Sequence, residues 1–588
     1  MCGILAVYSK NGQLPIDRCN SALEKLDKRG PDFKFSNIYY DGALFFGQTV
    51  LSITGNPNDY ITSYHKSSNN RYDLVLNGEI YNYKDLYNKF LKINKINNNT
   101  NSDTETLVNL HQILPLVEVY KNIRGMFAYI LFDHVSKSLI IGRDLIGEKI
   151  LYYFENDNFF IVCSEIGPIL KIVPTIKVNK ELLKEYFFTR HLLSPIETSF
   201  EGIRLVKPGF LKKYNLVSKR FTTIYSTKPA DLIDQNIIEE NKRKTFDQLL
   251  LELEEVFINT SKQLSPSIDY YSVFSGGIDS SLVSYYMQRT NPPTEFISLQ
   301  FPGKDSTNLL LSKFEKKLKR KINSIEVDKK IFLSHFPECY EAACAPLATH
   351  SFVSQAIMTA HLKNKNIKIL IGGDGADELF GGYEYYKNFN KEINYFPKVN
   401  PSVYSGFVPS KISFYNWVPS NLKEKINKEW LNISKYYSFE KNIHERLLQS
   451  VLYSDTVIQL ESVGIRSSDT MSMVNSVESR SFFLSYDMIK FALNLPSKYK
   501  INNDINNPLM STKPLLKALY ANIFGEKLIF KKQGFSGYPN EAANMIVDNK
   551  FPFLNKILDI KIPFNVDRSL EWKMMNVEIF LNNYRDHL

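Results

Sequence analysis

The sequence predicts a multi-domain α/β protein whose two halves are built differently. Roughly the first 205 residues consist of short strand-like runs separated by turns, such as residues 74–76 and 127–132. The second half alternates strand-like runs with helical periodicity, and beyond about residue 410 the pattern is largely helical. We therefore expect an N-terminal α+β domain, an antiparallel β-sandwich of the four-layer type, and a C-terminal doubly wound, mostly parallel sheet with many helices.

The predicted domains are residues 1–210 and 241–588, joined by a linker at 211–240 that is polar and weakly periodic. In the first domain, the run 74–76 ends at Asn77-Gly78, a pair typical of a hairpin turn. The Asn-rich stretch 94–101 is expected to be an exposed loop. Each domain is long enough to bury its own core.

In the second domain, an apolar run at residues 269–274 is followed by Ser275-Gly276-Gly277 and then by a helical pattern at 278–288. Further strand-like runs occupy residues 295–301 and 367–371. Strands that alternate with helices indicate a mostly parallel sheet. Such sheets bind ligands beyond the carboxyl ends of their strands, so the segments after these runs are candidates for a site.

The composition is that of a globular protein, with 44% apolar and 23% charged residues. No apolar run reaches the roughly 18 residues that span a bilayer. Basic residues, with a net charge of +10, are interspersed with acidic ones, so a nucleic-acid binder is not expected. Because there is no leader pattern and no CxxC pair, we expect a cytoplasmic protein without a disulfide framework or zinc site. The cysteines are Cys2, Cys19, Cys163, Cys339 and Cys344.

Cys2 carries the first chemical signal. Removal of Met1 would leave one residue with both a thiol and a free α-amine, whose pKa is roughly 7.7–8.0. Such an amine can take the thiol proton and so activate the sulfur as a nucleophile for amide hydrolysis. By itself a cysteine at position 2 is weak evidence, and the rest of the chain has to support it.

Several motifs follow Cys2 in one order. They are Cys2-Gly3-Ile4, Arg29-Gly30-Pro31-Asp32, Asn77-Gly78-Glu79-Ile80-Tyr81-Asn82, Ser102-Asp103-Thr104-Glu105, Arg124-Gly125-Met126-Phe127-Ala128, and Arg143-Asp144 with Gly147. Together they resemble the glutaminase domain of N-terminal-nucleophile amidotransferases, in the form found in glutamine-dependent asparagine synthetases. The resemblance implies that Cys2 is the nucleophile and that Asn77 and Gly78 stabilise the oxyanion. The implied glutamine-binding positions are Val50, Ser52, Asn77, Gly78, Glu79 and Asp103.

Val50 departs from the family pattern. In the family, an Arg at this position of the segment 48–53 holds the α-carboxylate of glutamine, and an isopropyl group cannot form that contact. Three alternatives remain. The first is that another base, such as Arg71, His65 or Lys66, replaces the Arg. The second is that glutamine binds weakly, and the third is that the amide donor is not free glutamine. We predict glutaminase activity with a raised KM for glutamine.

The run Ser275-Gly276-Gly277-Ile278-Asp279-Ser280-Ser281 lies between a predicted strand and a predicted helix. Its glycines let the backbone approach a ligand, and the N–H groups at the helix start form an anion site. The complete pattern resembles the pyrophosphate loop of ATP pyrophosphatases, which split ATP into AMP and pyrophosphate. The ATP-binding residues implied by the resemblance are Val273, Ser275, Gly276, Gly277, Asp279, Ser280, Ser298, Gly372 and Gly373.

A cluster of carboxylates follows the predicted strand at 367–371. The segment 371–383 matches the asparagine synthetase pattern. The implied residues for substrate, pyrophosphate or Mg²⁺ are Asp374, Asp377, Glu378 and Lys513. Because Mg²⁺ favours one or two carboxylates together with phosphate oxygens, Asp279 and Asp377 are the expected metal ligands. Three segments depart from the family: Lys304-Asp305-Ser306, Asn323-Ser324, and residues 346–359. The last of these contains no Arg to hold an aspartate α-carboxylate.

The resemblance implies a two-domain amidotransferase that uses ATP and Mg²⁺. Ammonia from glutamine is expected to reach a carboxylate activated as an acyl-adenylate, with aspartate as the first choice and AMP and pyrophosphate as by-products. The alternative is a related enzyme that amidates a sugar acid, a peptide or a natural-product intermediate and favours free ammonia. A non-enzymatic RNA-binding scaffold is disfavoured, because Cys2 and the 275–281 loop are both present. The expected partners are small molecules, without nucleic acid or membrane, and a homodimer is left open.

Overall fold

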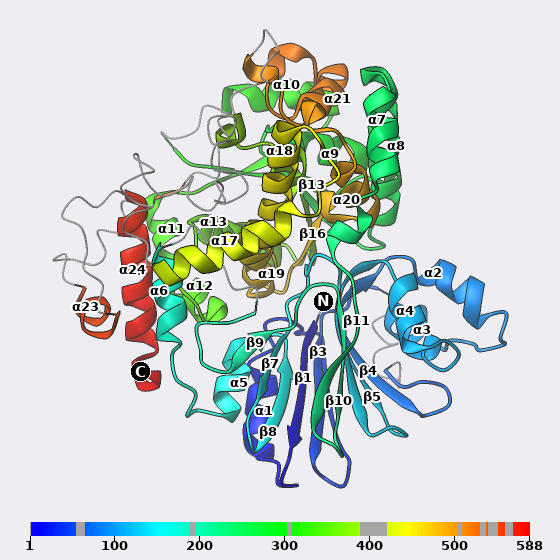
Figure 1. Cartoon of the computed structure of the whole chain (residues 1–588), viewed down its shortest axis with the longest axis vertical. Helices are drawn as coiled ribbons and strands as arrows, with labels where there is room; N and C mark the ends of the chain where they lie inside the picture. The colour runs from blue at the N-terminus through cyan, green and yellow to red at the C-terminus, as the bar shows by residue number, and fades with distance from the viewer. Residues whose placement is uncertain are drawn as a thin grey trace.

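The computed structural model describes residues 2–54, 65–188, 196–302, 308–387, 420–502, 508–529, 537–538, 551–558 and 568–588. The predicted departure at Lys304-Asp305-Ser306 lies outside these residues. Two sheets form the lower part of the molecule in Figure 1, and a largely helical part sits above them. No described helix combines the length and the apolar character needed to cross a bilayer.

Two antiparallel sheets build the N-terminal half. Their strand orders are β2-β3-β1-β8-β7-β9 and β11-β10-β6-β5-β4. The first sheet contains β1 (Cys2–Ser9), β2 (Phe33–Tyr39), β3 (Leu44–Val50), β7 (Tyr152–Glu155), β8 (Phe159–Cys163) and β9 (Ile203–Leu205). The second contains β4 (Tyr72–Ile80), β5 (Gly125–Asp133), β6 (Ser138–Arg143), β10 (Phe210–Asn215) and β11 (Arg220–Ser226).

Helices cover both outer faces of this sandwich. Alternate side chains such as Ile4 of β1 and Ile130 of β5 meet between the sheets. Leu5 of β1 points the other way, onto the first helical layer, and Leu76 of β4 points onto the second. The predicted four-layer α+β sandwich is therefore confirmed. The helices of these layers are α1 (Ile16–Glu24) and α5 (Ile166–Ile172) on one side and α3 (Asp103–Leu110) and α4 (Leu116–Asn122) on the other.

Asn77-Gly78, a pair that taken alone is typical of a hairpin turn, does not form a turn here. Strand β4 continues through both residues and pairs with β5, with Asn77 opposite Ala128 and Gly78 opposite Phe127. Glycine is required here by close approach, because its φ is 131° and a Cβ would lie 2.0 Å from the Met126 carbonyl oxygen. The two residues are thereby held on a rigid strand rather than on a turn.

The predicted boundary at residue 210 falls inside the sandwich. Strand β10 begins at Phe210 and pairs with β6, and β11 extends the same sheet to Ser226. Because β11 is an edge strand whose side chains are largely exposed or half-buried, its polar sequence imitates a linker. The first part of the predicted linker 211–240 is therefore sheet, and α7 (Gln235–Arg243) follows it.

A parallel sheet organises the C-terminal half. Its order is β14-β13-β12-β15-β16, and every adjacent pair is parallel. Open α/β sheets bind ligands in a crevice beyond the carboxyl ends of the strands where the strand order reverses, which in this sheet is between β12 and β15. The predicted doubly wound sheet is confirmed. Its strands are β12 (Tyr271–Val273), β13 (Glu295–Gln300), β14 (Ile322–Glu326), β15 (Ile369–Gly372) and β16 (Glu478–Ser481).

Many helices surround this sheet, as predicted. Those nearest the sites are α8 (Phe246–Gln263), α9 (Ile278–Thr290), α13 (Ser351–Asn364), α14 (Ala376–Phe380), α19 (Arg466–Met473) and α21 (Pro514–Phe524). The red helix in Figure 1, α24 (Arg568–Asn583), lies beside α6 (Lys180–Phe188) of the N-terminal half. Beyond α24, the carbonyl of His587 accepts a hydrogen bond of 2.8 Å from the Val178 N–H. The C-terminal segment thus fastens the two halves together.

Candidate active site

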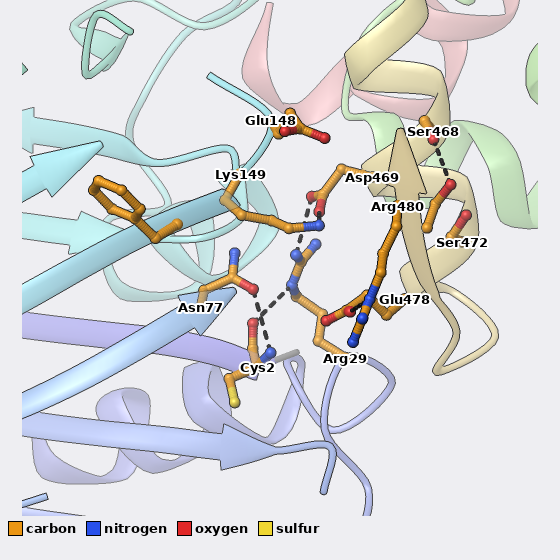
Figure 2. Close-up of polar contacts among 12 residues, drawn as sticks. Cys2, Arg29, Asn77, Glu148, Lys149, Ser468, Asp469, Ser472, Glu478 and Arg480 are labelled. Carbon is orange, nitrogen blue, oxygen red and sulfur yellow. Dashed lines mark hydrogen bonds and ion pairs between the residues drawn. The ribbon is translucent and has the colours of Figure 1, made fainter. Parts of the chain in front are cut away.

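Cys2 begins β1 and lies where the sandwich meets the helical half (Figure 2). It pairs with Val50 of β3 and is buried. Its backbone N–H donates to Oδ1 of Asn77 over 3.2 Å. Its carbonyl oxygen accepts a hydrogen bond from Nε of Arg29, also over 3.2 Å. Two sequence motifs therefore hold the backbone of Cys2.

The Asn77 side chain is fully buried, and only one end of its amide is in use. Oδ1 accepts from Cys2, whereas Nδ2 has no hydrogen-bond partner within the described part of the chain. A buried N–H group left unpaired costs about 1–3 kcal/mol, so a ligand atom is its natural partner. A donor beside Cys2 suits the negative oxygen that forms when a nucleophile attacks a carboxamide.

The Cys2 thiol needs a base before it can react. Burial raises its pKa above the usual value, and hydrogen bonds with Gln48 and the Leu51 backbone oppose this effect. Because the thiolate is the nucleophile, a neighbouring group has to take the thiol proton. The nitrogen of Cys2 is available for this role once it is a free amine.

Val50 and Ser52, two predicted glutamine-binding positions, lie at and just after the end of β3. Val50 lies directly opposite Cys2 and is 1% exposed. The Ser52 backbone N–H donates to Oδ2 of Asp32 over 2.7 Å. Neither side chain brings a positive charge to Cys2, so a different residue has to bind the α-carboxylate of glutamine.

Arg71 and Lys66, two of the bases considered as replacements, lie near the far end of β4. Arg71 forms two contacts with Asp133, at 3.1 and 3.0 Å, and is six residues, about 20 Å, from Asn77. Lys66 forms a backbone bridge with Asp73, which is four residues, about 13 Å, from Asn77. These distances place both outside the immediate surroundings of Cys2.

His65, the third base considered, is buried and stacks on Phe35 with ring centroids 4.4 Å apart. Burial lowers its pKa to about 4. The imidazole is therefore neutral at pH 7 and offers no positive charge to a carboxylate. None of the replacements considered from the sequence provides a cation at Cys2.

Asp103 lies at the start of α3, behind β4. Its Oδ2 accepts from the Ile80 N–H over 2.9 Å, and its Oδ1 accepts from the Thr104 N–H over 2.8 Å. Ser102 caps the helix through the same Thr104 N–H. Burial raises the pKa of Asp103 above its usual value. The carboxylate thereby fixes the end of β4, with its site residues, to α3.

Glu79, the other carboxylate predicted to meet the ammonium group of glutamine, forms an ion pair with Arg480 of β16. Arg480 also binds Glu478 over 2.7 Å and donates to the Leu264 carbonyl over 2.8 Å. Burial raises the pKa of Glu79 to about 7, against the attraction of Arg480. A residue expected to bind glutamine is thus joined to the C-terminal half.

The predicted nucleotide loop connects β12 to α9 at the crevice. Val273 ends β12, Gly276 has a φ of 76°, and Gly277 is the N-cap of α9. The hydroxyls of Ser275 and Ser280 are hydrogen-bonded over 2.9 Å, which closes the loop. Because Ser275 and Gly277 are exposed, the start of α9 is open to an anion such as a phosphate.

Two more predicted ATP-binding residues lie on strands that flank β12. Gly372 ends β15, on one side of β12. Ser298 is buried in β13, on the other side, and its hydroxyl accepts from the Gln300 side chain over 3.1 Å. The parallel sheet therefore gathers these residues around the strand that carries the nucleotide loop.

Lys513 links this loop to the second glycine-rich segment. Its Nζ lies 2.7 Å from both carboxylate oxygens of Asp279 and 2.6 Å from Oδ1 of Asp377. Burial lowers the pKa of Lys513, but the two carboxylates outweigh burial and hold it above its usual value. Gly382 permits this contact, because a Cβ there would lie 1.7 Å from Oδ1 of Asp377.

Asp374 and Glu378 complete the acidic segment. Burial raises the pKa of Asp374 to about 6, and a hydrogen bond with Ser468 opposes this rise. Glu378 is buried in α14 and accepts a hydrogen bond of 2.6 Å from the Tyr383 hydroxyl. With this pKa, Asp374 can donate or accept a proton close to neutral pH. The Glu378 carboxylate is instead hydrogen-bonded within the protein.

The described residues hold no group of three or more His, Cys, Asp or Glu side chains that could bind a metal ion alone. Asp279 and Asp377 nevertheless converge on one point, the Lys513 ammonium group. Two carboxylates are a sufficient protein share for Mg²⁺ when phosphate oxygens and water supply the other ligands. The donor set therefore fits Mg²⁺ together with a phosphate ligand.

Buried ion pairs connect Arg29, a neighbour of Cys2, to the C-terminal half (Figure 2). Arg29, which holds the Cys2 carbonyl, binds Asp469 of α19 over 3.0 Å and Glu165 over 3.3 Å. Lys149 reaches the same Asp469 over 3.5 Å. Arg29 belongs to one of the motifs found in the sequence, but no role was expected for it, for its partners Asp469 and Glu165, or for Lys149. A charged residue such as Arg29 inside a motif was the sequence feature that could have indicated these pairs, because a charge that the fold buries has to be paired.

Comparisons with known proteins agree with this geometry. Residues 1–225 match the glutamine amidotransferase domain, and residues 252–560 match asparagine synthase. Asparagine synthetase (glutamine-hydrolyzing) 1 of Bacillus subtilis (strain 168) is 23% identical, over 92% of this chain and 87% of the relative. Asparagine synthetase (glutamine-hydrolyzing) 3 of the same organism is 24% identical, over 97% and 93%. A putative asparagine synthetase (glutamine-hydrolyzing) 1 of Methanocaldococcus jannaschii is 24% identical, over 88% and 85%.

The asparagine synthase match covers more than half of the chain, and the glutamine amidotransferase match covers the β-sandwich. The two domains together perform glutamine-dependent, ATP-driven amidation. The chain therefore belongs to the asparagine synthase family.

Proposed function

We propose that the protein converts aspartate to asparagine with ATP and with ammonia released from glutamine. One arrangement supports this proposal most directly. Arg29 contacts the carbonyl of Cys2 and also Asp469, and the neighbouring Ser468 is hydrogen-bonded to Asp374. The part that releases ammonia and the part that consumes it are thus joined by a short chain of buried polar contacts.

The first reaction takes place at Cys2. After loss of Met1, the α-amine of Cys2 takes the thiol proton, and the sulfur attacks the carboxamide carbon of glutamine. The amide N–H₂ of Asn77 and the backbone N–H of Gly78 stabilise the oxyanion. The α-ammonium of Cys2 then returns the proton to the amide nitrogen, so that collapse of the intermediate breaks the C–N bond, expels ammonia and leaves a glutamyl thioester, which water hydrolyses to glutamate and the free thiol. Nδ2 of Asn77, which has no partner among the residues that the structure describes, supports the role of this side chain as the donor.

The second reaction takes place at the crevice of the parallel sheet. The 275–281 loop and the start of α9 bind the phosphates of ATP. Lys513 lies between Asp279 and Asp377, so its ammonium group is placed to stabilise the departing pyrophosphate. When bound by Asp279 and Asp377, Mg²⁺ supplies further positive charge to the phosphate oxygens.

The aspartate side-chain carboxylate attacks the α-phosphorus, pyrophosphate leaves, and an acyl-adenylate remains. Ammonia then attacks the acyl carbon, AMP leaves, and the amide forms after loss of a proton. Asp374 is suited to accept this proton, because its pKa of about 6 leaves it ionised at pH 7.5. Exclusion of water protects the adenylate from hydrolysis.

A second acceptor is supported by one observation. Residues 346–359 contain neither Lys nor Arg, so they offer no permanent cation for an aspartate α-carboxylate. The alternative function is amidation of a different carboxylate, such as a sugar acid, a peptide or a natural-product intermediate. ATP–pyrophosphate exchange across a panel of acids separates the two functions. Exchange stimulated by aspartate alone supports asparagine synthesis, and exchange with another acid but not aspartate supports the alternative.

The Cys2→Ala variant tests the division of labour between the halves. We expect it to lose glutamine-dependent synthesis, because the nucleophile is gone, and to retain synthesis from ammonium salts. Amide product and glutamate are measured with each nitrogen source. Cys19→Ala is a control that removes a buried thiol from α1, away from the proposed chemistry. Loss of both activities in Cys2→Ala, or of neither, would contradict the proposal.

A further inference from the structure

Lys368 of the C-terminal half reaches the segment beside Cys2. It directly precedes β15, and its Nζ lies 2.7 Å from Oδ2 of Asp32 and 3.2 Å from the Ser52 carbonyl oxygen. We propose that Lys368 binds the α-carboxylate of glutamine and so contributes to the selection of free glutamine as the amide donor. This inference rests on the proposed glutaminase function and adds a specificity residue from the other half of the chain.

Lys368 contacts a segment that directly follows the strand residue paired with Cys2. Val50 pairs directly with Cys2, which places their Cα atoms about 5 Å apart. Ser52 is two residues further along, at most about 7 Å. When the carboxamide of glutamine lies at the Cys2 sulfur, its α-carboxylate lies one side-chain length away. Lys368 contacts this flank of the site through Asp32 and Ser52.

The other basic residues considered for this role are paired with acidic groups, distant from Cys2 or neutral. Arg29 is 1% exposed and is bound to the Cys2 carbonyl, Glu165 and Asp469. Arg71 and Lys66 lie towards the far end of β4, and His65 is neutral at pH 7, as described above. By sequence, residues 55–64, which follow this flank, contain no Lys, Arg or His. A free carboxylate without a cation would be costly to desolvate, so Lys368 is the candidate left among the basic residues considered in the described part of the chain.

The ammonium group of Lys368 has capacity for a further acceptor. An ammonium has three N–H donors. Asp32 and Ser52 account for two of them, and the side chain of Lys368 remains 33% exposed. Asp32 also accepts from the Ser52 backbone N–H, so it holds the lysine and the flank in one arrangement. Since no other acceptor in the described part of the chain contacts this ammonium group, the third donor is available to a carboxylate oxygen of the ligand.

This arrangement predicts a weaker grip than an arginine would give. Arginine presents a planar fork that binds both carboxylate oxygens, whereas lysine is a point charge. Because Lys368 leads into β15 and the loop at 372–374, the glutamine site is complete only when the two halves are packed together. The replacement of an arginine by Lys368 as the partner of the α-carboxylate therefore accounts for the raised KM for glutamine that the sequence predicts.

The test compares glutamine with glutamine α-methyl ester, in which the carboxylate charge is masked. Glutamate or ester product is measured for the full chain and for Lys368→Gln, Lys368→Met and Lys368→Arg. The ratio of kcat/KM for glutamine to that for the ester should fall by about ten- to a hundredfold in Lys368→Gln and Lys368→Met, the range of one charge-assisted hydrogen bond. It should largely be kept in Lys368→Arg. Because the readout is a ratio within one enzyme, partial loss of folded protein cancels.

Lys365→Gln is the matched control, since Lys365 is exposed and lies on the same segment. It should keep the wild-type ratio. An unchanged ratio in Lys368→Gln and Lys368→Met, while the wild type hydrolyses glutamine, would overturn the role of Lys368 and leave the glutaminase function standing. A wild type that hydrolyses neither compound but still uses ammonium salts would overturn both.

Discussion

Asn77 is the residue on which the proposed glutaminase chemistry depends most closely. Its Oδ1 is fixed by the Cys2 N–H, so its Nδ2 is forced to point the other way and is buried without a partner among the described residues. An amide oriented in this way is a prepared donor, because no reorganisation is needed when negative charge develops beside it. Asn82, in the same motif, uses both ends of its amide for the protein.

The Asn77→Asp variant tests this orientation. It keeps the size of the side chain and the acceptor for Cys2 but replaces the donor with an oxygen. We expect kcat for glutamine hydrolysis to fall by about 10²–10³ or more, the effect of losing one oxyanion donor. Glutamate release is measured, with ammonia-dependent amidation as the internal reference. In the matched variant Asn82→Asp, kcat should change much less, and equal losses in the two variants would argue against an oxyanion role.

Asp374 gives a prediction for the pH dependence of stability. Burial raises its folded pKa to about 6 from an ordinary value of 3.8. Between about pH 4 and pH 6 the folded state therefore binds more protons than the unfolded state, and stability falls as the pH rises. Asp374→Asn should melt at a higher temperature than the wild type at pH 7.5, with the difference shrinking towards pH 4, while amidation is lost. A pH-independent difference in melting temperature would contradict this account.

Helix α14 shows how glycines shape an element at the site. Gly375 and Gly381 flank this short helix with φ values of 91° and 74°, a region that residues with a side chain rarely adopt. Gly382 then lets Asp377 and Lys513 approach, because a Cβ would lie 1.7 Å from Asp377 and 2.3 Å from Cε of Lys513. The acidic cluster is thus positioned by backbone that only glycine allows.

Gly382→Ala should therefore displace the Asp377–Lys513 pair. We expect ammonia-dependent amidation to fall by at least about a hundredfold, since misplacement of about 1 Å can cost that much. Glutamine hydrolysis at Cys2 should persist. The control is Gly167→Ala in α5, where a Cβ would meet Cys344 only at 3.9 Å and where alanine favours the helix. Full amidation activity in Gly382→Ala would show that the cluster tolerates the shift.

At the scale of the whole molecule, buried ion pairs join the two halves. Asp469 receives both Arg29 and Lys149, and Arg143 pairs with Glu461 over 3.4 Å, with each of these side chains at most 3% exposed. Buried charges are costly to desolvate, so such pairs hold a specific arrangement rather than add much net stability. Because Arg29 also holds the Cys2 carbonyl, its pair with Asp469 ties the geometry of the nucleophile to the packing of the halves.

Asp469→Asn tests this link. It leaves Lys149 and Arg29 with less compensating charge, and breaking a buried pair typically costs about 3–5 kcal/mol. We expect a lower urea midpoint and more glutamate released per amide formed. The control is Glu341→Gln, which breaks an exposed 3.8 Å pair with Lys28, worth at most about 1 kcal/mol. A wild-type ratio of glutamate to amide in Asp469→Asn would mean that the ion pair does not couple the reactions.

Some features could be predicted from the sequence because they are local. The strand, loop and helix around residues 269–288 follow from periodicity and glycine placement, and the structure has β12 and α9 there. Other features could not be predicted in this way. The edge strand β11 resembles a linker because its side chains face solvent, and Asn77-Gly78 resembles a turn although β5 extends it as a strand.

By itself, the sequence determined the fold class of each half and the residues proposed as nucleophile and nucleotide loop, since these depend on short-range patterns. Only the tertiary structure decided the orientation of the Asn77 amide, the pairing of Glu79 with Arg480 and the approach of Lys368 to Ser52. Each of these contacts joins residues far apart in the chain. They form only when strands and domains pack, because burial then forces each polar group to find a partner.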